Sequence, residues 1–101
     1  MKKLISKREI NITAIVPVFN EEHYLKKSVL RLVRENIVQK IIIVNDCSTD
    51  NSQSIIDDLC ETYKFIEYFK TDRNIGKGGA VNFVKEHIKT EYVIIHDADL
   101  E

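Results

Sequence analysis

The 101-residue chain alternates between two hydrophobic periods, and each change of period marks a new element. Three continuous apolar runs rich in β-branched residues are typical of buried strands; they cover residues 10–18, 38–46 and 91–98. Residues 64–71 alternate like a strand with one exposed face. Apolar residues spaced three and four apart predict helices over residues 21–36, 50–63 and 80–89.

This order, βαβαβαβ, predicts an α/β fold with a parallel four-stranded sheet and helices on both faces. We expect residues 1–101 to form a single domain. If strands two and three extend outward from strand one and strand four lies on its other side, right-handed crossovers put the first two helices on one face. The third helix then covers the other face alone.

Composition narrows the class without naming a function. The chain is 44% hydrophobic and 31% charged, which is ordinary for a soluble globular protein. Its net charge is −1, so the sequence does not suggest a basic surface that would bind nucleic acid. No apolar run is long enough for a membrane span, and we expect a cytoplasmic location. Cys47 and Cys60 are interpreted as free thiols, and the histidines lack zinc-ligand spacing.

The stretch IVPVFNEE, residues 15–22, joins the first strand to the first helix. Asn20 is a good candidate N-cap, and Glu21 and Glu22 would then sit in the first turn, where the helix dipole favours negative charge. A simple capped helix start explains these residues about as well as a ligand site does.

The stretch IIIVNDCSTDNS, residues 41–52, leads from the second strand into the second helix. Ser48, Thr49 or Asp50 is expected to cap that helix. Asp46 stands at the carboxyl end of a parallel strand, which is where open α/β sheets bind ligands.

The stretch NIGKGGA, residues 74–80, has three glycines at a helix start, with Lys77 among them. Backbone N–H groups of such a loop can approach a phosphate, and Lys77 would add a point charge. The dinucleotide fingerprint is excluded because it follows the first strand and needs a glycine where Val81 stands, and the Walker pattern is missing.

The final stretch, HDADLE, places Asp97 and Asp99 two residues apart, so that both would share one face of a continuing strand. Two carboxylates this close repel each other unless a cation lies between them. Mg²⁺ or Mn²⁺ is the natural partner, and such ions usually share their shell with substrate phosphates. A solvated strand end is the alternative.

In order and spacing, these four stretches together resemble the family-2 inverting glycosyltransferases of the GT-A fold. The resemblance covers essentially the whole chain and is nearest to the branch acting on polyprenyl phosphates, such as dolichol-phosphate mannosyltransferase. It implies a nucleotide-diphospho-sugar donor (a UDP- or GDP-sugar) and a divalent metal. The donor-binding residues that it implies are Pro17, Phe19, Glu21, Val44, Asp46, Lys77, Asp97 and Ala98.

Individual roles follow from the same resemblance. Pro17 and Phe19 would line the base and ribose, Val44 would pack beside the base, and Asp46 would hydrogen-bond the nucleoside. Asp97 and Asp99 look like the family's DXD motif, and Glu101 stands where some relatives place a third metal contact. The metal ligands implied are therefore Asp97, Asp99 and Glu101.

The sequence departs from the family pattern in two ways. Asn45 replaces the first of two aspartates in the strand-two loop and keeps a hydrogen-bonding group. Cys47 replaces a glycine, which puts a left-handed turn there in question. Family members also continue well past DXD into the half that binds the acceptor and supplies the base. We therefore expect this chain to bind donor but to carry no catalytic residue, with any membrane contact made by regions outside it.

The expected topology brings the motifs together without help from the resemblance. The sheet reverses direction between strands one and four, so residues 17–22 and 96–101 should lie side by side with Asp46 adjacent. The same topology leaves strand four, with the apolar residues 92–95, as an unpaired edge. We expect that edge either to self-associate or to be covered by a missing C-terminal half.

Two other functions compete with the glycosyltransferase hypothesis. One is a non-catalytic α/β interaction module, a degenerate remnant that is indifferent to metal and nucleotide. The other is a phosphatase of the haloacid dehalogenase type, which the DxD pattern suggests. That chemistry needs its aspartate pair after the first strand, whereas here the pair closes the fourth.

Overall fold

A computed structural model describes residues 10–99. Its elements are β1 (Ile12–Val18), α1 (Leu25–Glu35), β2 (Lys40–Asn45), α2 (Ser52–Thr62), β3 (Ile66–Lys70), α3 (Gly76–Phe83), the 3₁₀ helix η2 (Lys85–His87) and β4 (Tyr92–Ile95). The four predicted strands and three predicted helices are all present. The third helix begins earlier than expected, at Gly76, and its predicted C-terminal part is the separate turn η2.

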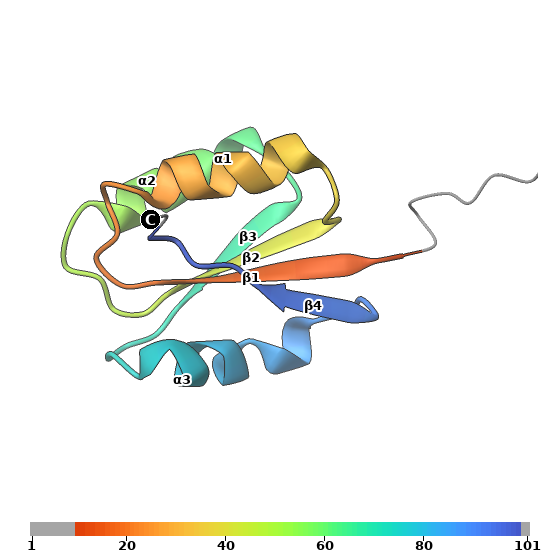
Figure 1. The fold of residues 1–101 in the computed structure, drawn as a ribbon. Helices are drawn as coiled ribbons and strands as arrows, with labels where there is room; N and C mark the ends of the chain where they lie inside the picture. Colours follow the sequence, from red (N-terminus) through yellow and green to blue (C-terminus); the bar gives the residue numbers. More distant parts are fainter. Residues whose placement is uncertain (1–9, 100–101) are drawn as a thin grey trace, which may run out of the picture.

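The sheet has the order β3-β2-β1-β4, and all of its strand pairs are parallel. This confirms the predicted topology, with the reversal between β1 and β4. Val18 lies opposite Asn45, so β1 and β2 end level, whereas β4 ends where Ile95 faces Ile15. The chain therefore leaves β4 three residues before β1 ends, and its last described residues run along β1 toward the start of α1 (Figure 1).

Helices cover both faces of the sheet: α1 and α2 lie on one face and α3 on the other (Figure 1). Alternate residues of each strand point to opposite faces, which divides the core in two. Ala14, Val16, Ile41 and Ile43 face α1 and α2, and Ile15, Ile42 and Val44 face α3. The single-domain extent over all 101 residues stays a prediction.

The predicted N-cap at Asn20 is wrong. Helix α1 begins four residues after Glu21, and its first residue has no side-chain cap. Asn20 instead adopts a left-handed backbone, with φ 53°, and its side-chain oxygen accepts hydrogen bonds from the amides of Thr49 (2.8 Å) and Asp50 (3.2 Å). Glu21 and Glu22 therefore lie in the turn before the helix and not in its first turn. The Asn20 side chain bonds backbone amides of the loop after β2 instead of an amide of its own helix.

The loop after β2 interlocks with the loop after β1. Asp50 Oδ1 accepts a hydrogen bond from the amide of Ser52 at the start of α2 (2.9 Å), and Asp50 Oδ2 accepts one from the amide of Glu22 (3.2 Å). The predicted N-cap at Ser48, Thr49 or Asp50 is wrong, because the N-cap of α2 is Asn51, whose side chain makes no cap hydrogen bond. Asp50 satisfies the first helical amide from one residue before the N-cap. Cys47 keeps a left-handed conformation, with φ 64°, despite replacing a glycine.

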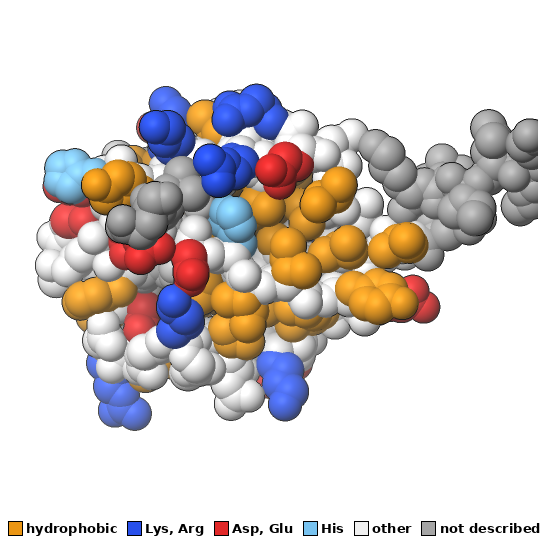
Figure 2. All heavy atoms as spheres, viewed as in Figure 1, with side chains coloured by type: hydrophobic (Ala, Val, Ile, Leu, Met, Phe, Trp, Pro, Cys, Tyr) orange, Lys and Arg blue, Asp and Glu red, His pale blue; other side chains and the backbone are white. Residues whose placement is uncertain are grey.

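Strand β4 is the exposed edge that the sequence predicts. Among residues 10–99 it pairs with β1 alone, and the exposed fractions of its side chains run from 37% to 56%. Figure 2 shows apolar side chains gathered over this strand. Self-association through this edge stays a prediction. None of the helices described between residues 10 and 99 combines the length and hydropathy needed to cross a bilayer.

Candidate functional site

A hollow of about 260 Å³ opens at the carboxyl end of the sheet. It is lined by Pro17, Val18, Phe19, Glu21, Asp46, Asn74, Gly76 and Lys77. Five of these residues belong to the donor set that the sequence predicts, and they come from three separate stretches of chain. The position matches the general rule that ligands of open α/β sheets bind at the carboxyl ends of the strands, where strand order reverses.

Asp46 is the buried hub of this hollow, with 3% of its surface exposed. Its Oδ1 accepts hydrogen bonds from Thr71 Oγ1 (2.8 Å) and the amide of Ile75 (2.9 Å), and its Oδ2 accepts one from the amide of Gly76 (2.8 Å). The carboxylate therefore satisfies amide donors at the start of α3, where the helix dipole favours negative charge. These hydrogen bonds, here called the Asp46 latch, were not predicted from the sequence, and neither was the role of Thr71. The sequence feature that points to Thr71 is a hydroxyl side chain directly after β3.

The glycine loop is shaped by this latch. Gly76 has φ +83°, a left-handed conformation that suits glycine, and the amide of Gly76 is already bonded to Asp46. A Cβ on Gly79 would lie 3.1 Å from the Ile75 side chain, so that glycine permits close packing within the loop. The predicted contact of this loop with a phosphate stays a prediction.

Lys77 bridges the mouth of the hollow. Its Nζ lies 2.6 Å from Asp97 Oδ1, and both side chains are more than half exposed. The hydrogen bond to Asp97, reinforced by its charge, raises the pKa of the Lys77 ammonium. This contact ties the first turn of α3 to the segment after β4, across the sheet reversal.

Acidic groups converge on Glu21 from two directions. Burial raises the pKa of the Glu21 carboxyl, and the charges of Asp99 and Asp50 raise it further, while Lys77 acts in the opposite sense. The Glu21 backbone is held in place because its amide donates to Ser52 Oγ (3.0 Å). Asp97 also lies next to the loop after β1 through Lys77, which lines the hollow together with Pro17 and Glu21 and pairs with Asp97. Residues 100 and 101 of the predicted juxtaposition lie outside the described residues.

The two aspartates flank an anchored residue. Strand β4 ends at Ile95, so Asp97 and Asp99 do not lie in a continuing strand as the sequence suggested. Both aspartates are exposed, whereas Ala98 between them is 3% exposed and packs into the core on the α1 side of the sheet.

Ser28 of α1 fixes this segment from behind. Its hydroxyl donates to the carbonyl of Asp97 (2.8 Å) and lies 2.9 Å from His96 Nε2. Since the hydroxyl proton is directed at Asp97, the imidazole nitrogen is the donor to Ser28. Neither Ser28 nor His96 was singled out from sequence, although both hold the DXD segment in place.

A divalent metal would find few ligands among the described residues. Residues 10–99 contain no group of three or more His, Cys, Asp or Glu side chains arranged to hold an ion, and the predicted third ligand, Glu101, lies outside that range. Asp97 and Asp99 remain as two exposed carboxylates, and Asp97 is engaged by Lys77. One or two carboxylates, completed by water and substrate phosphates, are a usual shell for Mg²⁺, so the chemistry of these two side chains is compatible with such an ion.

The remaining predicted residues differ in accessibility. Phe19 is 46% exposed at the rim of the hollow, whereas the Val44 side chain is fully buried beneath α3. The base contact predicted for Val44 therefore stays a prediction. Asn45 keeps its hydrogen-bonding role, because its amide donates to Gln53 Oε1 (2.6 Å) and its oxygen accepts from the amide of Ser48 (3.0 Å).

A second, larger hollow of about 440 Å³ lies among residues at the amino-terminal ends of the strands, such as Thr13, Lys40 and Glu67. Its lysine and glutamate already pair with each other at 3.2 Å. None of the predicted site residues lines it, so the hollow at the carboxyl end is the candidate site.

Comparison with known proteins identifies the family of the chain. The sequence pattern of glycosyl transferase family 2 matches residues 13–101. The chain belongs to this family. Among curated relatives, it is 36% identical over 93 residues to a teichoic acid poly(glycerol phosphate) polymerase of Staphylococcus epidermidis, covering 89% of this chain and 13% of the relative. It is 28% identical over 107 residues to a dolichyl-phosphate beta-glucosyltransferase of Trichomonas vaginalis, covering 97% and 33%.

Solved structures of similar proteins share the fold of this family-2 chain. A mannosyltransferase of Pyrobaculum calidifontis in complex with GDP-Man and Mn²⁺ superposes with a TM-score of 0.80 at 26% identity, covering 87% of this chain and 27% of that one. TarS 1–349 of S. aureus in complex with UDP-GlcNAc superposes with a TM-score of 0.79 at 23% identity. The chain thus has the GT-A architecture and spans about a third or less of the length of these relatives.

Proposed function

We propose that this chain is the donor-binding part of a glycosyltransferase that takes its sugar from a nucleotide-diphospho-sugar. The observation that carries the proposal is the hollow at the sheet reversal, where Pro17, Phe19, Glu21, Asp46 and Lys77 meet. Support also comes from the family and from two structural neighbours whose complexes hold GDP-Man and UDP-GlcNAc.

Each residue has a chemical task in this proposal. The half-exposed Phe19 ring offers a flat apolar surface to the base, and the Asp46 carboxylate retains acceptor capacity for the nucleoside beside the amides it already holds. Lys77 stands where a diphosphate would lie between α3 and Asp97, and its ammonium would neutralise one phosphate.

Mg²⁺ or Mn²⁺, held by Asp97 and Asp99, would neutralise the diphosphate leaving group. Ser28 and Ala98 would keep the two aspartates directed outward for this role. Glu101 is proposed as a further contact. The acceptor, for which a polyprenyl phosphate is one candidate class, and the base that activates it are proposed to lie outside these residues, so the chain by itself should transfer no sugar.

The test is calorimetric titration of UDP and GDP, each with and without Mn²⁺, into the chain and into Asp99→Ala. Metal-dependent binding of one nucleotide is expected and should be lost in Asp99→Ala. Asp57→Ala on α2 is the matched control, since it removes an exposed aspartate remote from the hollow. Binding that ignores both metal and Asp99, or no binding of either nucleotide, contradicts the proposal. Robust sugar transfer by this chain alone would contradict the division of labour.

A further inference from the structure

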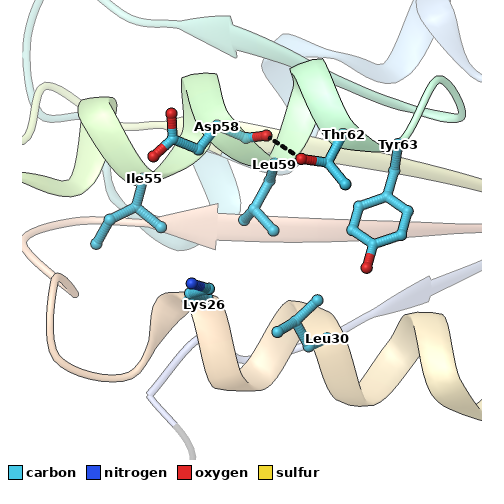
Figure 3. Close-up of a pocket in the computed structure, with 7 residues that line it drawn as sticks. All are labelled: Lys26, Leu30, Ile55, Asp58, Leu59, Thr62 and Tyr63. Carbon is cyan, nitrogen blue, oxygen red and sulfur yellow. Dashed lines mark hydrogen bonds between the residues drawn. The ribbon is translucent and has the colours of Figure 1, made fainter.

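A third hollow, of about 320 Å³, lies between α1 and α2 and is separate from the proposed donor site. Its apolar lining is Leu30 from α1, Ile55 and Leu59 from α2, and Tyr63 directly after α2. Figure 3 shows these side chains directed into the space between the helices. Its polar lining is Lys26 from α1 with Asp58 and Thr62 from α2. We call this surface the α1/α2 groove.

The two rims of the α1/α2 groove carry opposite charge. Helix α1 exposes four cations and one anion, and these are Lys26, Lys27, Arg31, Arg34 and Glu35. Helix α2 exposes three anions and contains no lysine or arginine; its anions are Asp57, Asp58 and Glu61. Figure 2 shows the cationic side chains grouped on the α1 side of the molecule.

These opposite charges do not neutralise each other within the chain. The ion pairs found among residues 10–99 join Glu22 to His23, Lys40 to Glu67 and Lys77 to Asp97, and none of them links α1 with α2. Lys26 and Asp58 face the same groove without approaching to 4 Å. The groove is therefore an apolar floor between a positive rim and a negative rim, both available to an outside partner.

We propose that the α1/α2 groove is an interface for a second copy of this chain, beyond the donor-binding function. A two-fold axis lying in the interface and running along the helices would place α1 of each copy over α2 of the other. Positive rims then meet negative rims twice, and the two apolar floors face each other. An axis across the helices would instead set α1 on α1 and α2 on α2, so that like charges repel.

The size of the face sets the expected strength. Each helix has 11 residues and is about 16 Å long, so the contact is smaller than the roughly 800 Å² per partner of a standard interface. We expect a weak dimer with a dissociation constant between about 10 µM and 1 mM. Because its rims are exposed, raising the salt to about 0.5 M should weaken it several-fold.

Charge reversal distinguishes this dimer from association through β4. The first variant is Lys27→Glu/Arg34→Glu on α1 and the second is Asp58→Lys/Glu61→Lys on α2; all four side chains are exposed and none lines the donor hollow. Each variant alone brings like charges together and should weaken its dimer by at least about tenfold. An equimolar mixture of the two variants should form a dimer with a dissociation constant near that of the wild type, because the reversed α1 of one variant then faces the reversed α2 of the other.

Sedimentation velocity from about 10 µM to 1 mM measures all of these species, and circular dichroism checks that each variant is folded. A chain that stays monomeric at about 1 mM overturns the proposal. A dimer that survives both reversals but is lost in Ile94→Lys on β4 overturns it in favour of edge pairing. The proposal is also overturned if both variants are folded and their mixture does not regain the wild-type dissociation constant. If either double variant unfolds, the single variants Lys27→Glu and Glu61→Lys replace the two double variants.

Discussion

Asp46 Oδ2 accepts a 2.8 Å hydrogen bond from the amide of Gly76, and this contact joins the end of β2 to the first residue of α3. The two residues are 30 positions apart, and the same carboxylate also holds Thr71 and Ile75. One buried side chain thus joins the hollow at the carboxyl end of the sheet to the glycine loop that starts α3.

Replacing Asp46 with asparagine should destabilise the protein by about 1–3 kcal/mol, because an amide NH₂ would face donors that now point at a carboxylate oxygen. Urea unfolding measures the change. Thr71→Val is the matched control: it removes one donor, leaves the backbone amides bonded to Asp46, and should cost about 1 kcal/mol. Equal stability of Asp46→Asn and the wild type would show that the latch contributes nothing.

Lys77→Met should weaken metal-dependent nucleotide binding by about tenfold, since a charge-assisted contact to phosphate is lost. Binding of Mn²⁺ alone should instead tighten, because Lys77 no longer competes for Asp97. Calorimetry separates the two effects, and Lys85→Met, an exposed lysine of η2 outside the hollow, is the control. Parallel losses of metal and nucleotide affinity would contradict the competition.

The Glu21 carboxyl predicts a pH dependence of stability. Burial and neighbouring acids raise its folded pKa above the ordinary 4.5, so the native state holds its proton more tightly than the unfolded chain. Stability contributed by Glu21 is therefore lost as pH rises through that folded pKa. The free energy of unfolding of Glu21→Gln should therefore rise relative to that of the wild type between pH 4 and pH 7. The expected gain is less than about 1 kcal/mol, because the group is mostly solvated.

Urea unfolding of the wild type, Glu21→Gln and Asp50→Asn at integer pH values from 2 to 7 follows this difference and its control. Asp50 provides a control of opposite sign: burial acts to raise its pKa, but hydrogen bonds from Ser52 and Glu22 lower it overall. Its stabilisation is lost as pH falls through the folded pKa, below the ordinary 3.8. A constant gap between Glu21→Gln and the wild type would contradict the clustering of acids around Glu21.

The Cys60 thiol should react slowly with disulfide reagents. Burial raises its pKa above the ordinary 9.0, and the charges of Asp57 and Glu67 raise it further, so little thiolate exists near neutral pH. In the Cys47→Ser background, labelling by a disulfide reagent at pH 7.5 should proceed at least about tenfold more slowly than in the urea-unfolded chain. Comparable rates in the two states would contradict the burial of this side chain.

The sequence by itself determined the elements, their order and the sheet topology, because these depend on local periodicity and on the handedness of crossovers. Continuous apolar runs such as residues 41–44 have nowhere to lie except between two helical layers. The same reasoning predicted where a hollow would open, since the carboxyl ends of β1 and β2 and the segment after β4 must meet where strand order reverses.

Only the tertiary structure decided what the polar side chains bind. The sequence predicts Asn20 as the cap of the following helix, but its side chain bonds the loop after β2. It predicts Asp46 as a ligand contact, but the Asp46 carboxylate accepts hydrogen bonds from the start of α3. Both outcomes depend on donors about 30 residues away, which no local pattern records. The charge difference between α1 and α2 was likewise present in the sequence, yet only the placement of both helices on one face of the sheet put the two charges on either side of one groove.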